Sequence, residues 1–315
     1  MAINKYMRAA LKALSYMEVD LKTNYEMLRR IELVTKKPRI KLSYKTWDNH
    51  VNNNGYKVPV RIFTPTHENN LSGLKYPVIV FLHGGGWVTG NLDSYEKVCL
   101  TIARQTGYML IAVDYRLAPE YPFPTALEDC YQAIKVALHW HQISDIPRGI
   151  TLMGDSAGGN LAAAVSLYMR DKGEKMVDKQ ILIYPATYND HTETSPFQSV
   201  LEYGTEHLLT SKRICDYMDL YCRKEADRNN PYFAPLLAND FSNQPDTLII
   251  TAQYDPLRDE AEEYGRKLKE AGNCVVIRRM ADTLHGFFSL PLRFSAVKES
   301  YNIINQFLLE EKLDE

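Results

Sequence analysis

The chain has 315 residues, of which 45% are hydrophobic, so it is long enough to bury the core of one α/β domain with an accessory segment. Its net charge of −2, with acidic and basic residues interspersed, excludes a basic surface for nucleic acid and favours a small, roughly neutral substrate. Charged residues interrupt the N-terminal stretch, and no run reaches the roughly 18 apolar residues of a membrane-spanning helix, so we expect a cytoplasmic protein without signal peptide or membrane insertion.

Two amphipathic helices are predicted ahead of the sheet. Apolar residues recur at helical spacing over residues 4–19 and again from Leu21 to Ile31, until Lys37 and Pro38 end the pattern. Packing on the domain surface and capping of a substrate pocket are both open interpretations for these helices. Strands over residues 43–47 and 58–64, around an Asn-rich turn, then predict a β-hairpin.

After the hairpin, the pattern changes to short apolar runs that alternate with helices. Such runs are typical of parallel strands that are covered on both faces. The sequence therefore predicts an α/β fold with a mostly parallel sheet of about eight strands and helices on both faces. The expected strands cover residues 77–82, 109–114, 150–153, 180–184, 247–251 and 274–278, and the expected helices cover residues 95–105, 126–141, 157–170, 256–271 and 295–309.

Three consecutive glycines follow the first of these strands, in the loop from His83 to Trp87. A loop that keeps them, at a cost in backbone entropy, usually needs unusual dihedrals or exposed N–H groups. A flexible loop is the simpler interpretation. Next to a nucleophilic serine, however, the N–H groups of Gly84 and Gly85 can join that of Ala157 to hold an oxyanion. His83 is expected to brace this loop.

That serine is Ser156, in the strand-to-helix turn Gly154-Asp155-Ser156-Ala157-Gly158. Small neighbours let the strand and the helix approach closely, so the hydroxyl projects beyond the strand end. The N–H of Ala157 opens the helix and has no partner within it. A nucleotide-binding loop is excluded because Asn160 and Leu161 occupy the positions of its Lys and Ser or Thr.

An inserted segment is expected at residues 188–230, above the sheet, with an amphipathic helix over residues 211–222. Beyond it, Asp255 directly follows a strand and can either cap the next helix or orient a histidine. Asp259 and Asp282 are weaker candidates for that orienting carboxylate. His285 lies in the loop after the last strand and is the expected base. The other histidines lie in connecting segments or near a helix end and are expected to be inert: His50, His67, His139, His141, His191 and His207.

Taken together, the motifs resemble the hormone-sensitive-lipase-like branch of the α/β-hydrolases, near the bacterial acetyl esterases. The resemblance runs from about residue 76 to residue 287. It is carried by His83-Gly84-Gly85-Gly86, Tyr115-Arg116-Leu117-Ala118-Pro119-Glu120, Gly154-Asp155-Ser156-Ala157-Gly158-Gly159, Tyr184-Pro185, Tyr254-Asp255-Pro256-Leu257-Arg258-Asp259 and His285-Gly286-Phe287.

The resemblance implies a Ser156, Asp255 and His285 triad, whose chain order is the one expected for an α/β-hydrolase, and an oxyanion hole of Gly84, Gly85 and Ala157. The N-terminal helices, residues 1–42, and the insertion at 188–230 are similar in position to the family's cap. The catalytic domain is then residues 43–315.

The predicted reaction is hydrolysis of small, short-acyl esters through an acyl-enzyme, with no metal or organic cofactor. The five cysteines show no metal-binding spacing. Alternatives are a longer-chain lipase, an amidase or, as a non-enzyme, a ligand-binding receptor similar to the plant gibberellin receptors, which lack a working triad histidine. Trp87, Tyr203 and Phe287 are expected to line the substrate pocket. An exposed sheet edge at residues 274–278 could pair two subunits as a homodimer.

Overall fold

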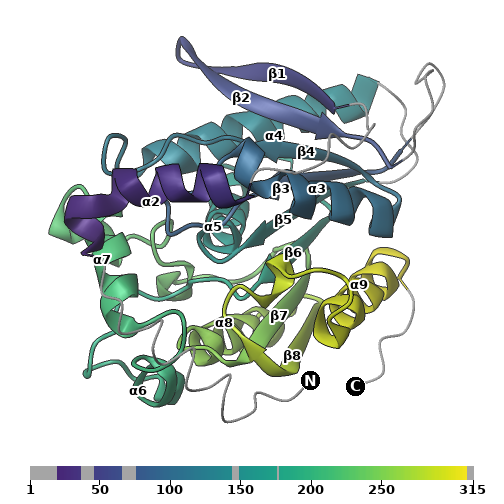
Figure 1. Ribbon diagram of the computed structural model, residues 1–315. Helices are drawn as coiled ribbons and strands as arrows, with labels where there is room; N and C mark the ends of the chain where they lie inside the picture. The colour runs from purple at the N-terminus through teal and green to yellow at the C-terminus, as the bar shows by residue number, and fades with distance from the viewer. Residues whose placement is uncertain (1–19, 37–45, 66–75, 144–148, 176, 311–315) are drawn as a thin grey trace.

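An eight-stranded, mostly parallel sheet forms the centre of the protein, and helices cover both of its faces (Figure 1). The structure is a computed structural model that describes residues 20–36, 46–65, 76–143, 149–175 and 177–310. The helix predicted over residues 4–19 lies outside the described residues. The strands are β1 (Thr46–Asn53), β2 (Tyr56–Phe63), β3 (Val78–Leu82), β4 (Met109–Val113), β5 (Ile150–Asp155), β6 (Lys179–Ile183), β7 (Asp246–Tyr254) and β8 (Val275–Leu284).

The strand order across the sheet is β1-β2-β4-β3-β5-β6-β7-β8. β2 pairs antiparallel with both β1 and β4, and the pairs from β4 to β8 are parallel. The predicted hairpin is confirmed, but its first strand continues to Asn53 instead of ending at residue 47. Its polar middle, Asp48 to His50, hides the strand in the sequence because an outer strand exposes side chains to solvent. β8 forms the opposite edge, as expected.

Two apolar layers enclose the sheet, one on each face. In β3, Val78, Val80 and Leu82 face one layer, while Ile79 and Phe81 face the other. All five are fully buried, which is why the strand is continuously apolar. The first layer is completed by α4 (Thr125–Ile143), α5 (Ala157–Asp171) and α8 (Arg258–Glu270), and the second by α3 (Leu92–Thr106) and α9 (Ser295–Leu308).

The N-terminal helix α2 (Leu21–Lys36) and the inserted segment lie side by side at one end of the sheet (Figure 1), because α2 packs against both α3 and α7. Arg29 of α2 fastens this helix: its Nε donates to the Val88 carbonyl at 2.7 Å, and Nη2 donates to the Ala118 carbonyl at 2.8 Å. The remaining elements are α6 (Gln198–Tyr203), α7 (Ser211–Tyr221) and the short 3-10 helices η1 (Glu225–Asn229), η2 (Pro235–Leu237) and η3 (Phe287–Ser289).

Asn160 of α5 ties together the two stretches of chain that flank the inserted segment. Its buried amide donates to the carbonyls of Ala186 at 2.8 Å and Phe233 at 2.9 Å. Because Asn160→Ala leaves both carbonyls without this donor, we expect the free energy of unfolding to fall by about 2–4 kcal/mol. Urea unfolding measures the change. Asn305→Ala is the control, since that amide donates to the Gln105 carbonyl at an exposed site; an equal loss in both variants would contradict the role of Asn160.

Candidate active site

Ser156 stands on the break between β5 and α5, as the sequence predicts. Its backbone is held at φ 54° and ψ −119°, a conformation that non-glycine residues rarely adopt. The turn is tight: a Cβ at Gly154 would lie 2.2 Å from the carbonyl oxygen of Gly158, and one at Gly158 would lie 2.0 Å from that of Leu82. The glycines on either side therefore allow the strand and helix backbones to approach closely enough to expose the serine hydroxyl.

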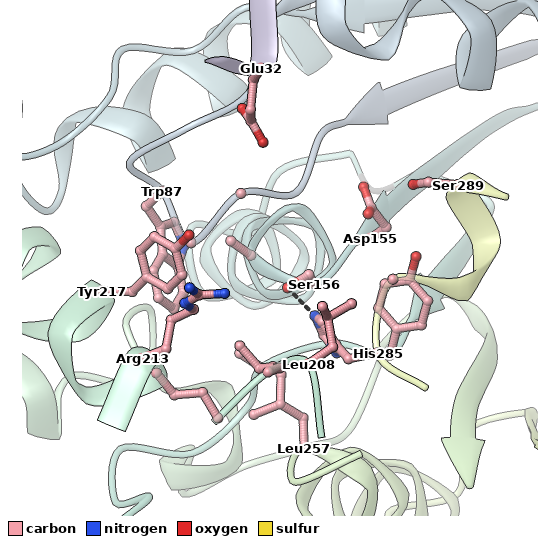
Figure 2. A pocket seen from close by; sticks show the side chains of 18 of the residues that line it. Glu32, Trp87, Asp155, Ser156, Leu208, Arg213, Tyr217, Leu257, His285 and Ser289 are labelled. Carbon is pink, nitrogen blue, oxygen red and sulfur yellow. Dashed lines mark hydrogen bonds between the residues drawn. The ribbon is translucent and has the colours of Figure 1, made fainter. Parts of the chain in front are cut away.

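Three loops that are distant in the sequence bring Ser156, His285 and Asp255 together. Nδ1 of His285 lies 2.7 Å from Asp255 Oδ2, and Nε2 lies 2.8 Å from Ser156 Oγ (Figure 2). A carboxylate only accepts hydrogen bonds, so Nδ1–H donates to Asp255, and Nε2 of the neutral ring accepts from the serine hydroxyl. Asp255 is fully buried, which keeps this carboxylate away from water.

Asp255 contacts both the chain just ahead of α8 and the ring of His285. Oδ1 accepts the N–H of Leu257 at 3.0 Å and so shapes the turn that leads into α8, while Oδ2 faces His285. The two rival carboxylates are engaged elsewhere. Asp259 accepts from Arg258 at 2.7 Å and from the Ser199 N–H at 2.8 Å. Asp282 is exposed.

The glycine loop differs from the expectation at its first position. The N–H of Gly84 donates to Oδ1 of Asp155 at 2.8 Å, so it is occupied within the protein and not directed at an oxyanion. The phenol of Tyr95 donates to the other oxygen of Asp155 at 3.1 Å. The second and third glycines, Gly85 and Gly86, are the ones that line the pocket with Ala157. The sequence signal for this shift was Asp155, a buried acceptor next to the serine.

The pocket above Ser156 has a volume of about 300 Å³. Gly86 forms part of its wall next to Tyr217. Only glycine fits there, because a Cβ would lie 2.3 Å from the Tyr217 ring. Side chains from α2, the inserted segment and the sheet loops all contribute. The lining residues are Glu32, Gly85, Gly86, Trp87, Tyr95, Asp155, Ser156, Ala157, Tyr184, Ala186, Leu208, Leu209, Arg213, Ile214, Tyr217, Leu257, His285, Gly286 and Ser289.

Of the three aromatic residues predicted to line the pocket, only Trp87 does so. Phe287 is buried in the core, edge-on to Tyr184, with ring centroids 5.6 Å apart. Tyr203 lies in α6, where its ring contacts Tyr254 at a centroid distance of 5.8 Å. The prediction was wrong for these two residues because position along the chain does not reveal on which side of a loop or helix a ring points.

His83 braces the glycine loop, as expected. Its Nδ1–H donates to the Gly84 carbonyl at 2.8 Å, and its ring stacks on Tyr115 with centroids 4.3 Å apart. Nε2 lies 4.0 Å from Asp114, whose pKa is raised to about 6 by burial of the carboxyl. The loop is therefore held by the buried side chains of His83 and Tyr115.

A second buried histidine–carboxylate pair, which the sequence does not predict, lies outside the pocket. The sequence predicts an inert histidine in a polar segment at His191, but this residue is 1% exposed, and its Nε2 lies 2.5 Å from Glu260. Glu260 also accepts the N–H groups of Thr187 at 2.6 Å and Tyr188 at 3.1 Å. This pair joins the start of the inserted segment to α8, the helix that follows Asp255. Nothing in the local sequence distinguishes it from a surface pair.

A sequence profile of the alpha/beta hydrolase fold matches residues 79–289, which include the glycine loop, Ser156, Asp255 and His285. The chain belongs to the α/β-hydrolase family. This α/β-hydrolase is 36% identical over 249 residues to an arylesterase of Saccharolobus solfataricus, with 78% of each chain covered. It is 34% identical over 238 residues to an ethyl acetate hydrolase of Pseudomonas putida, with 75% of this chain and 73% of the relative covered.

The α/β-hydrolase is also similar to solved structures over nearly its whole length. An esterase of the archaeon Pyrobaculum calidifontis superposes with a TM-score of 0.82 at 34% identity, covering 98% of this chain and 99% of that one. These relatives confirm the resemblance to the hormone-sensitive-lipase-like branch and the predicted fold class. In the part of this α/β-hydrolase that the structure describes, no helix is both long and apolar enough to cross a bilayer.

Proposed function

We propose that this chain is a serine carboxylesterase that hydrolyses small, short-acyl esters through an acyl-enzyme on Ser156. The family and the named relatives give the reaction class, carboxylic ester hydrolysis. The roles of the individual residues rest on one observation, the continuous hydrogen-bonded chain from Asp255 through His285 to Ser156. That chain connects a buried carboxylate to a hydroxyl that opens into a pocket, which is what activation of a serine requires.

In the first step, Nε2 of His285 removes the Ser156 proton while Oγ attacks the ester carbonyl carbon. The imidazolium then gives this proton to the leaving alcohol as the carbon–oxygen bond breaks. In the second step, water attacks the acyl carbon, His285 takes a proton from the water, and the acid leaves as Oγ regains a proton. Asp255 holds the ring in the tautomer that accepts at Nε2 and stabilises its positive charge.

The negative charge that develops on the carbonyl oxygen needs N–H donors at the same place. We propose that the N–H groups of Gly85, Gly86 and Ala157 form the oxyanion hole. The sequence predicts Gly84, Gly85 and Ala157 instead. The three proposed donors line the pocket with Ser156, and Ala157 begins a helix, so its N–H has no acceptor within that helix. Donors fixed in place before the reaction are usually the largest single contribution to catalysis.

Pocket size supports short acyl groups. A volume of about 300 Å³ is at the lower end of the range for ligand pockets. We expect 4-nitrophenyl acetate and butyrate to be the best substrates in a chain-length series, with kcat/KM at least about tenfold lower for dodecanoate. Equal or rising kcat/KM up to dodecanoate would favour the longer-chain lipase instead. Matched nitroanilides test the amidase alternative, for which turnover would have to be comparable to that of the esters.

A non-catalytic receptor is disfavoured because His285 is present and hydrogen-bonded to Ser156.

We further propose that α2 and the segment at residues 188–230 act together as the cap of a catalytic domain that spans residues 43–315. Glu32 of α2 and Arg213 of α7 line the same pocket, which supports this division. Pairing of two subunits through the free edge of β8 and a cytoplasmic location stay predictions.

A further inference from the structure

Arg213 brings a positive charge into the pocket wall. It lies in the first turn of α7, where Thr210 caps the helix by accepting the Arg213 N–H at 3.2 Å. Figure 2 shows its guanidinium directed from α7 toward the middle of the pocket, where Ser156 lies. The residue is half-buried. The cap thus contributes a cation to a cavity whose other cap residues are largely apolar, including Leu208, Leu209 and Ile214.

This guanidinium has no carboxylate partner within 4.0 Å among the residues that the structure describes, and its side chain makes no hydrogen bond there. Two other half-buried arginines do have such partners. Arg29 bonds Glu120 at 2.8 Å, and Arg116 bonds Asp129 at 2.7 Å. Removing a charge from water is costly unless the charge is paired, so an arginine held without a partner inside a pocket points to an anionic group supplied by a ligand.

The carboxylates of the pocket already have donors within the protein. Asp155 accepts from Gly84 and Tyr95, and Glu32 accepts the Gly90 N–H at 3.1 Å. Burial raises the pKa of the Tyr217 phenol, and the Arg213 charge opposes that rise while the Glu32 charge adds to it. The charge of Arg213 is therefore felt inside the pocket. A planar guanidinium matches the two oxygens of a carboxylate better than any other side chain does.

We propose that Arg213 binds an ionised carboxylate carried by the ester. The preferred substrates are then short esters with a second, free carboxylate, and not the roughly neutral ones that the net charge of the whole chain favours. This inference rests on the proposed esterase function at Ser156. Two substrate types have this chemistry: monoesters of dicarboxylic acids, with the charge on the acyl part, and acyl esters of hydroxy acids, with the charge on the alcohol part. The remote carboxylate does not change during the reaction, so its binding lowers KM rather than raising kcat.

Two pairs of matched esters test the proposal on the full chain. The first pair is 4-nitrophenyl hydrogen glutarate and 4-nitrophenyl pentanoate, which carry acyl chains of equal length. The second pair is 4-acetoxybenzoate and its methyl ester. The ratio of kcat/KM for the anionic ester to that for the neutral ester is measured in the wild type and in each variant. Because each ratio is taken within one protein, it does not depend on the fraction of that protein that is folded.

We expect the wild type to favour the anionic member of one pair by about tenfold or more, and Arg213→Met to lower that ratio by about 10- to 100-fold, mainly through KM. Arg213→Gln, which retains polar bulk, should lower it similarly, and Arg213→Lys less. The pair that responds shows which part of the ester carries the charge. Lys212→Met is the control, because Lys212 is exposed on the same helix and bonds Asp216 at 3.0 Å; its ratio should change by less than about threefold.

Each other result has a definite meaning. A wild type that prefers the neutral member of both pairs, or ratios that Arg213→Met and Arg213→Gln leave unchanged, overturns the carboxylate proposal while ester hydrolysis stands. A fall of equal size in Lys212→Met also overturns it, since the effect would then be a general field and not binding at Arg213. No hydrolysis of any of the four esters by the wild type would overturn the esterase function itself.

Discussion

Replacement of Ser156 by alanine is expected to lower kcat/KM for 4-nitrophenyl acetate by at least about 10⁴-fold, since loss of a serine nucleophile removes the covalent route altogether. The Ser156 hydroxyl bonds the ring of His285, and its backbone N–H, which donates to the Ile183 carbonyl at 2.9 Å, is retained in alanine. The free energy of unfolding should therefore change by no more than about 1 kcal/mol. Initial rates of nitrophenol release and a urea unfolding curve measure the two quantities.

A matched serine lies in α5, the helix that follows Ser156. Ser166 is buried in α5 away from the pocket, and its hydroxyl has no hydrogen-bond partner among the described residues. Ser166→Ala should keep kcat/KM within about twofold of the wild type. If Ser156→Ala retained a tenth or more of wild-type activity in protein free of other esterases, the acyl-enzyme on Ser156 would have to be abandoned.

Replacement of Asp255 by asparagine is expected to lower kcat by about 10³- to 10⁴-fold while KM changes little. The Asn oxygen can still accept the Leu257 N–H at the Oδ1 position, so the turn is retained. The amide NH₂ then faces Nδ1 of His285 and donates to it. This reverses the tautomer, and Nε2–H points at Ser156, where it cannot accept the hydroxyl proton. Steady-state kinetics on 4-nitrophenyl acetate separate kcat from KM.

Asp259 offers the matched control for this variant. It is a neighbouring carboxylate in the first turn of α8, just after the turn that holds Asp255, but it bonds Arg258 and the Ser199 N–H instead of His285. Asp259→Asn should cost less than about tenfold in kcat, through small shifts of the helix start. Equal losses in the two variants would mean that any carboxylate lost from this turn disturbs the site, and that Asp255 has no specific role toward the imidazole.

The turn glycines show how local sequence already contains local geometry. Gly154 and Gly158 predict a tight strand-to-helix turn, because glycine allows backbones to approach closely. The structure has that turn, with no room for a Cβ at either glycine and with Ser156 at φ 54°. The chain order of Ser156, Asp255 and His285 could be read in the same way, since each follows a predicted strand and parallel strands end at one edge. These positions depend on short stretches of chain and on the sheet's regularity.

Gly84, Tyr203 and Phe287 show what the local sequence does not predict. Whether an N–H is free or a ring faces a cavity depends on partners that come from elsewhere in the chain. The N–H of Gly84 donates to Asp155. The ring of Phe287 packs against Tyr184 in the core, and the ring of Tyr203 packs against Tyr254. The sequence does not predict the buried pair of His191 and Glu260 for the same reason. The two residues are polar and far apart in the sequence, so neither position by itself indicates burial.

The sequence by itself determined the α/β fold, the family and the residues that form the hydrogen-bonded chain at Ser156, because apolar periodicity and turn glycines act over a few residues. Only the tertiary structure decided which N–H groups are free, which side chains line the pocket and that the charges of Glu32 and Arg213 enter it. The N–H of Gly84 depends on Asp155 in another loop, and the two pocket charges depend on the packing of α2 against α7. Amphipathic helices do not encode in their own sequence which partner they will meet.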